Sequence, residues 1–197
     1  MNILHSNEFT VTVAWLSYVS LHSLFATLTL KNFLKENVKP LFYYHRLLYN
    51  LFAVASFSIA FSFQLQLEPY YFLENSLFKT IFGYTGIVSG ILVIVFTFVY
   101  SYPLLEFAGL EPSKQGGALL TRGLSKKVRH PLYLGVFLIC WGGFIAYTHS
   151  LTLVQAIVFT IYIFLGLKLE EKKLLLEHND YSEYKQRTPF IFPDFFK

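Results

Sequence analysis

Five long apolar stretches alternate with polar segments along this chain, and that pattern limits the folds open to it. A helix needs about 20 apolar residues to cross the roughly 30 Å of hydrocarbon in a bilayer. Stretches that reach or approach this length lie at residues 9–30, 46–67, 80–102, 131–149 and 151–168. We therefore predict an all-α fold, a polytopic membrane helix bundle with five transmembrane helices.

The composition agrees with a membrane protein. Hydrophobic residues make up 54% of the chain and charged residues only 14%, whereas soluble domains carry about a quarter charged residues. A single cysteine, Cys140, excludes an internal disulfide framework and a cysteine-based zinc site, and no histidines stand at metal-ligand spacing. The net charge of +4 would suggest nucleic acid for a soluble protein, but here we expect the lipid bilayer as partner and no nucleic acid.

The basic residues predict how the chain is oriented in the membrane. Of the 16 lysines and arginines, 15 fall in segments that a five-span arrangement places on one side, and Lys79 is the exception. The positive-inside rule then puts the N-terminus outside and the C-terminus in the cytosol, as in a multi-pass protein of a bacterial inner membrane. We expect one integral membrane domain over residues 1–197, with three spans in 1–102 and a long loop, a helical hairpin and a cytosolic tail in 103–197.

Local signals refine this arrangement. The last two apolar stretches are separated only by residues 148–150, which predicts a helical hairpin with a tight turn. The tail after it predicts a cytosolic helix that ends before Pro189. In the third stretch, Gly86 and Gly90 are spaced so that another helix can approach closely, either within the bundle or in a dimer.

Residues 129–133, Arg-His-Pro-Leu-Tyr, lie where a basic loop meets the fourth apolar stretch. Proline is favoured in the first turn of a helix, so Pro131 marks a helix start directly after His130. Such a start presents unpaired backbone N–H groups and the positive end of the helix dipole, to which Arg129, His130 and Tyr133 add side-chain donors. This pattern favours a site for a carboxylate or phosphate, and the alternative is a hydrogen-bonded interfacial histidine.

A pair of acidic residues, Glu170 and Glu171, follows the fifth apolar stretch on the same side of the membrane. In a hairpin the start of one helix lies beside the end of the next, so we expect this pair to approach His130. The alternative is a solvated charge cluster with Lys172 and Lys173.

The motifs together resemble a known family. They are Leu120-Thr121-Arg122-Gly123, Arg129-His130-Pro131 with Tyr133 and Gly135, Glu170-Glu171 with Leu174, and Tyr181, Tyr184 and Pro189. Over about residues 115–193 this combination resembles the isoprenylcysteine carboxyl methyltransferase family and its prokaryotic relatives, which include phospholipid and methanethiol methyltransferases. The resemblance implies an integral membrane enzyme that uses S-adenosyl-L-methionine.

The resemblance also implies site residues. Those expected to bind the cofactor are Gly117, Ala118, Leu119, Leu120, Ser125, His130, Pro131, Leu132, Tyr133 and Glu170. Those expected to act in catalysis, by orienting charge or assisting proton removal, are Arg129, Glu170 and Glu171. The methyl acceptor is expected to be a lipophilic molecule or a small thiol, carboxylate or amine at the cytosolic membrane face, and no metal is expected.

Three positions depart from the family pattern. Ser125 stands where an aromatic residue is usual, and Gly166 stands where the family has an arginine for the prenylcysteine carboxylate. Lys168 does not replace that arginine, because two residues turn a helix by about 200°. A usual phenylalanine-glycine pair is absent at residues 177–179. These departures leave two alternatives to a methyltransferase: a non-catalytic accessory protein on the same scaffold, or an NADPH enzyme similar to sterol reductases.

Overall fold

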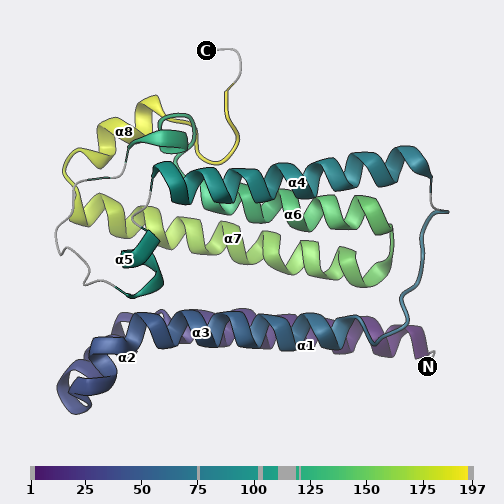
Figure 1. Cartoon of the computed structure of the whole chain (residues 1–197), viewed down its shortest axis with the longest axis horizontal. Coiled ribbons are helices and arrows are strands. Elements are labelled where there is room, and N and C mark those ends of the chain that lie inside the picture. The colour runs from purple at the N-terminus through teal and green to yellow at the C-terminus, as the bar shows by residue number, and fades with distance from the viewer. Residues whose placement is uncertain (1–2, 75, 102–103, 111–118, 120, 195–197) are drawn as a thin grey trace. The chain divides into compact units, whose positions relative to one another are not determined.

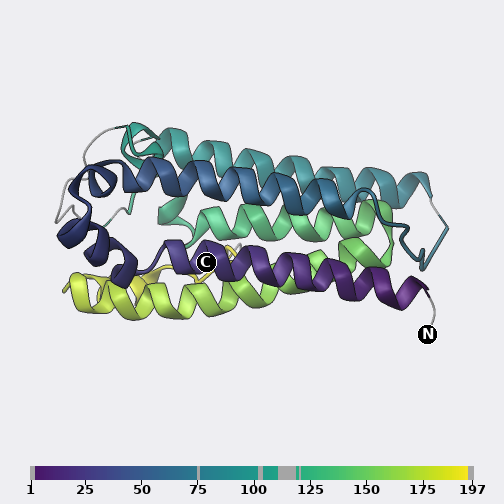
Figure 2. The same cartoon turned by 90° about the horizontal axis from the view of Figure 1, so that it is seen from below.

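The computed structural model describes residues 3–74, 76–101, 104–110, 119 and 121–194 (Figures 1 and 2). These residues form α-helices and one 3-10 turn, and within them we find no strand beyond an isolated bridge between Tyr71 and His149. The predicted all-α fold is thus confirmed. The chain divides into two compact units: an N-terminal unit of Met1–Tyr70 and Leu104–Lys114, and a C-terminal unit of Tyr71–Pro103 and Gln115–Lys197.

The N-terminal unit consists of α1 (Ile3–Phe25), α2 (Leu28–Asn37), α3 (Lys39–Gln64) and the short α5 (Leu104–Ala108). α1 and α3 run alongside each other in opposite directions (Figure 2). Buried Trp15 of α1 donates its indole N–H to Gln64 Oε1 of α3 at 2.6 Å, and the Tyr49 hydroxyl lies 2.7 Å from His22 Nε2. Such polar contacts between otherwise apolar helices fix their pairing in a membrane.

The prediction of one continuous helix over residues 9–30 is wrong near its end. α1 stops at Phe25, and Thr27 adopts an extended conformation in which its hydroxyl accepts the Leu30 N–H at 3.3 Å. A threonine in this position caps a new helix, because its side chain satisfies a backbone donor that has no partner within the helix. α2 therefore starts in a new direction.

The C-terminal unit is built on α4 (Leu77–Tyr100), α6 (Pro131–Tyr147) and α7 (Ser150–Glu177), with the 3-10 turn η1 (Gly123–Lys126) and α8 (Tyr181–Arg187) at one end (Figure 1). The predicted tail helix is divided, since α7 ends at Glu177 and α8 begins at Tyr181. Chain direction alternates along the three long helices, so the end of α4, the start of α6 and the end of α7 share one end of the unit.

Glycines bring α4 and α6 into close contact. A Cβ on Gly90 would lie 2.5 Å from the Gly135 carbonyl oxygen, and one on Gly86 would lie 3.2 Å from the Gly142 Cα. The two backbones therefore approach more closely than any larger residue would allow. Of the two alternatives for the Gly86 and Gly90 spacing, the structure shows packing within the bundle.

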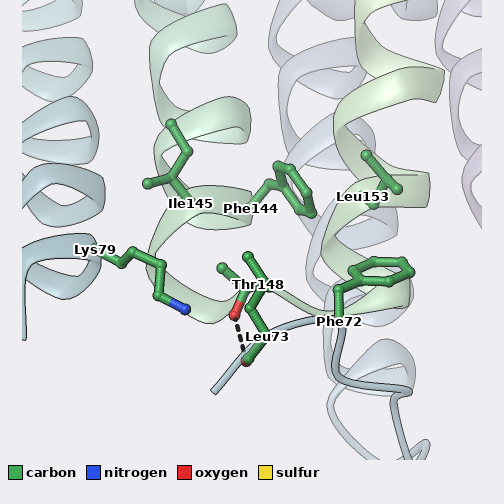
Figure 3. Close-up of a pocket in the computed structure, with 7 residues that line it drawn as sticks. All are labelled: Phe72, Leu73, Lys79, Phe144, Ile145, Thr148 and Leu153. Atoms are coloured by element: carbon green, nitrogen blue, oxygen red, sulfur yellow. Dashed lines mark hydrogen bonds between the residues drawn. The ribbon is translucent and has the colours of Figure 1, made fainter. Parts of the chain in front are cut away.

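The opposite end of this unit carries a cavity of about 350 Å³ (Figure 3). A segment before α4 crosses this end, where the Phe72 N–H donates to the Thr148 carbonyl at 3.0 Å and the Thr148 hydroxyl donates to the Leu73 carbonyl at 3.2 Å. The cavity is lined by Phe72, Leu73, Lys79, Phe144, Ile145, Thr148 and Leu153. Its lining side chains are apolar apart from Thr148 and Lys79, and the Lys79 ammonium is hydrogen-bonded to the Glu74 carbonyl.

By length and composition, three helices in the described part of the chain can cross a bilayer: Leu41–Gln64 of α3, α4 and α7. The segments Ser6–Phe25 and Thr29–Asn37 pass the same test only as a pair, bent by 51°, and α6 is apolar but shorter at 17 residues. The chain is therefore a helical membrane protein.

Replacing Gly90 with alanine tests the close approach of α4 and α6. We expect a loss of about 1–3 kcal/mol in the free energy of unfolding, because the added methyl group must push the two backbones apart. Gly143→Ala is the matched control in α6, since a Cβ there meets nothing within 4 Å. It should raise stability by up to about 1 kcal/mol. Thermal unfolding in detergent measures both, and equal changes would contradict the assignment.

Candidate functional site

The segment before α6 packs against a small apolar core. Val128 is buried together with Leu134 of α6, Ile163 and Leu167 of α7, and Ile191 of the C-terminal segment. Pro131 occupies the first turn of α6 and His130 precedes it as the N-cap residue. The sequence prediction of a helix start at Pro131 is confirmed. Because Val128 and Leu134, on either side of the helix start, are both packed in this core, the backbone that carries residues 129 and 130 is held in place.

The carboxylate of Glu171, in α7, is the centre of a polar cluster. Its Oε1 lies 2.7 Å from Arg129 Nε, 3.4 Å from His130 Nε2 and 3.2 Å from the Tyr181 hydroxyl. Its Oε2 lies 2.8 Å from Lys185 Nζ. Glu171 is only 8% exposed, so these charge-assisted hydrogen bonds replace the water that the carboxylate loses on burial.

Arg129 ties the C-terminal segment to the start of α6. Its Nη1 donates to the carbonyls of Lys185 at 2.9 Å and Thr188 at 2.6 Å, and its backbone N–H donates to the Pro189 carbonyl at 2.9 Å. Its guanidinium lies over the Phe190 ring at 5.2 Å, a favourable arrangement of a cation on an aromatic face. Through these hydrogen bonds Arg129 holds the C-terminal segment against the start of α6, and we call this arrangement the Arg129 clamp.

A second tie joins the C-terminal segment to η1. The hydroxyl of Tyr184 donates to the Ser125 carbonyl at 2.6 Å, and both residues are buried.

Burial, together with the adjacent Glu171 charge, raises the pKa of Tyr181. Tyr181 therefore stays a hydrogen-bond donor to Glu171 throughout the physiological pH range.

His130 is 4% exposed, and burial lowers its pKa below the usual value. The charges of Glu170 and Glu171 and the hydrogen bond to Glu171 act in the opposite direction, while Arg129 adds to the lowering. The imidazole is therefore neutral at neutral pH, with one nitrogen as donor and the other as acceptor. The rings of Tyr133 and Phe190 contact it edge-on, with centroids 6.0 and 5.5 Å away.

The structure brings together predicted residues that are about 40 positions apart. Arg129, His130 and Glu171 share one cluster, and Glu170 is half-buried beside it. The alternative of a solvated acidic cluster does not describe Glu171, although Lys172 and Lys173 are exposed and Lys173 pairs instead with Glu177 at 3.7 Å. Pro131, Leu132 and Tyr133 form the first turn of α6.

The remaining predicted cofactor residues divide into two groups. Ser125 is buried in η1 and Leu119 is half-buried. Gly117, Ala118 and Leu120 lie outside the described residues. Gly166, the position that departs from the family pattern, faces α6, because a Cβ there would lie 3.9 Å from the Tyr133 hydroxyl.

Sequence reasoning missed Lys185 and Thr188. Lys185 supplies the contact to Glu171 Oε2, and Thr188 supplies a carbonyl to Arg129. Tyr181 and Tyr184 entered only through their spacing in the resemblance. A signal for Lys185 was present, since it follows Tyr181 by one helical turn and so shares a helix face with it.

The fold and this cluster define a helical membrane protein with a polar site at the entrance of α6. Residues 25–188 match the family described as "Protein of unknown function (DUF1295)", and the chain belongs to that family. No solved structure gives a significant match.

Curated proteins similar to the chain are methyltransferases by name. It is 42% identical over 71 residues to methanethiol S-methyltransferase 1 of Bradyrhizobium diazoefficiens (36% of this chain, 24% of the relative). It is 43% identical over 70 residues to methanethiol S-methyltransferase of Crocosphaera subtropica (34% and 26%). It is 34% identical over 114 residues to the enzyme of that name from Pseudomonas deceptionensis (52% and 41%).

The matched part spans less than half of each of these relatives. The family and the relatives together confirm the resemblance to isoprenylcysteine carboxyl methyltransferase-like membrane proteins that the motifs predicted.

Glu171→Gln tests the cluster as a structural centre. We expect it to lower the free energy of unfolding by about 3 kcal/mol, because Arg129 and Lys185 lose a charged partner in a buried setting. Glu170→Gln is the matched control, since no described residue hydrogen-bonds that half-buried side chain, and it should cost less than about 1 kcal/mol. Thermal unfolding in detergent compares the two, and a control as damaging as the test would contradict this assignment.

The lowered pKa of His130 makes stability depend on pH. Below about pH 6.5 the unfolded chain takes up a proton on this residue while the folded protein does not, so acidification favours unfolding. The effect is at most about 1.4 kcal/mol per pH unit, and it ends once the folded protein binds the same proton. Between about pH 7 and pH 5, the free energy of unfolding should decrease less steeply for His130→Gln than for the native chain. Parallel curves for the two proteins would contradict the lowered pKa of His130.

Proposed function

We propose that the chain is a membrane methyltransferase that uses S-adenosyl-L-methionine at the cytosolic membrane face. The observation that carries this proposal is the convergence of Arg129 and His130 with Glu170 and Glu171 at one end of α6 and α7. The names of the relatives support it, since each is a methyltransferase. The same residues carried the resemblance in the sequence.

The proposed topology has five spans, α1, α3, α4, α6 and α7, in a single membrane domain. Within the C-terminal unit, Arg122, Arg129 and the lysines that flank them lie at the end shared by η1, α8 and the exit of α7. Lys79 lies at the other end, in the first turn of α4. This asymmetry supports a cytosolic site and C-terminus, and with five spans the N-terminus is then external, as proposed for a bacterial inner membrane protein.

Residues at the entrance of α6 fit the cofactor. Bound there, S-adenosyl-L-methionine supplies a methyl group on a positively charged sulfur, together with a carboxylate and an ammonium. The first internal hydrogen bond of α6 runs from Leu134 N to His130 O, so the start of this helix presents the positive end of its dipole to the carboxylate. Glu170 matches the ammonium, because its carboxylate has no hydrogen-bond partner among the described residues.

The other proposed cofactor contacts are His130, Pro131, Leu132, Tyr133, Ser125 and residues 117–120. Methyl transfer from a sulfonium is a displacement in which the donor is already activated, so the protein mainly positions two reactants and excludes water. Arg129 and Glu171 then act chiefly by fixing the site, since both Glu171 oxygens and the Nε and Nη1 atoms of Arg129 are engaged with each other or with the C-terminal segment.

The methyl acceptor could be a thiol, a carboxylate or an amine, on either a lipophilic or a small molecule. Among these three groups we favour a thiol. A carboxylate acceptor requires a cation beside it, and position 166, which faces Tyr133, is a glycine. The relatives named for methanethiol point to the same class.

Calorimetry with S-adenosylhomocysteine, with NADPH in parallel, tests the proposed cofactor. We expect S-adenosylhomocysteine to bind and Glu170→Gln to weaken it about tenfold or more, which corresponds to about 1.4 kcal/mol for one lost charged contact. Glu177→Gln is the control, because Glu177 is exposed two turns further along α7. Binding of NADPH alone would favour a reductase, and binding of neither would favour an accessory protein.

A further inference from the structure

If the acceptor is a thiol, as the proposed function holds, its proton must be removed before or during methyl transfer. The thiolate is the nucleophile, and an ordinary thiol with a pKa near 8.5 is largely protonated at neutral pH. A base beside the sulfur would therefore raise the rate. Four ionisable side chains from the segment before α6 and the end of α7 are considered as that base: Arg129, His130, Glu170 and Glu171.

Two of these candidates are unsuitable as bases. Arg129 keeps its charge in proteins and has no acceptor atom. Glu171 receives hydrogen bonds from Arg129, His130 and Tyr181 on one oxygen and from Lys185 on the other, so a thiol proton would compete with two cations. Glu171 is built to hold other groups in place.

The geometry of His130 suits a base. Its Nε2 lies 3.4 Å from Glu171 Oε1, and a carboxylate can only accept, so the neutral ring carries its hydrogen on Nε2. The lone pair is then on Nδ1, which no described residue hydrogen-bonds. Edge-on contacts with Tyr133 and Phe190 fix the plane of the ring. Catalytic hydrogen bonds are often long before ligands bind, which accommodates the 3.4 Å distance.

We propose that His130 is the general base of the reaction, with Nδ1 accepting the thiol proton and Glu171 as the positioning residue that sets the tautomer. The S–H bond breaks as the proton passes to Nδ1, and the thiolate sulfur attacks the sulfonium methyl carbon. A new carbon–sulfur bond forms while the bond from that methyl carbon to the sulfonium sulfur breaks, which leaves two neutral thioethers. The imidazolium then returns its proton to water.

The charges around His130 suit this step. Glu171 contacts the ring and Glu170 lies near it, so both stabilise the imidazolium that forms. Arg129 opposes the positive charge, but it is paired with Glu171, as is Lys185. Burial keeps the resting ring neutral and thus able to accept a proton.

Two acceptors of different acidity separate this role from cofactor binding. Methanethiol must lose its proton in the site, whereas 4-nitrothiophenol is already ionised at neutral pH and needs no base. With methyl transfer measured at saturating cofactor in the purified full chain, we expect His130→Gln to lower kcat for methanethiol about 100-fold or more. The rate with 4-nitrothiophenol should change by less than about threefold, because this acceptor needs no base and saturating cofactor offsets any weaker cofactor binding.

Further variants make the test decisive. Glu171→Gln should lower the methanethiol rate selectively and shift its pH profile, while His178→Gln, the same change as the test outside the cluster, should match the native chain. Equal loss with both thiols would show that His130 only holds the cofactor and would overturn the proposal, as would selective loss in Glu170→Gln instead. A native chain inactive with both thiols would overturn the thiol acceptor, and with it this proposal, whereas absence of S-adenosylhomocysteine binding would overturn the proposed function itself.

Discussion

A buried carboxylate must find partners or remain uncharged, and the polar end of the C-terminal unit is organised around that requirement. Glu171 meets it with groups from two parts of the chain: Arg129 and His130 before α6, and Tyr181 and Lys185 in α8. The same hydrogen bonds that satisfy the carboxylate also fix the positions of its partners. The cluster therefore joins the entrance of α6 to the exit of α7 at a site where apolar helices alone would not fix side-chain directions.

Sequence reasoning reached the helices of this site through signals that are local. Pro131 marked the start of α6, and the three-residue separation of the last two apolar stretches brought Glu171 near His130. The family pattern supplied Tyr181 and Tyr184. The sequence did not indicate which of Glu170 and Glu171 would be buried in the cluster. Adjacent residues on a helix point about 100° apart, and only packing decides which one is buried.

Other features depend on contacts that no local pattern encodes. The break at Thr27 follows from a side chain capping the next helix, in a stretch apolar enough to be one span. Lys185 and Thr188 join the cluster because α8 folds back over the entrance of α6, and a basic tail offers several lysines that would serve equally well by composition. The glycine spacing in α4 indicated a close partner, but only coordinates show that the partner is α6.

The Arg129 clamp has a consequence for biosynthesis. Ribosomes deliver the chain from its N-terminus, so Arg129 and Glu171 emerge before Lys185, Thr188 and Phe190 exist to meet them. Until α8 is synthesised, the guanidinium lacks the carbonyls of Lys185 and Thr188, and the carboxylate lacks the Lys185 ammonium. The part of this site that depends on α8 therefore forms only after all the long helices have been synthesised.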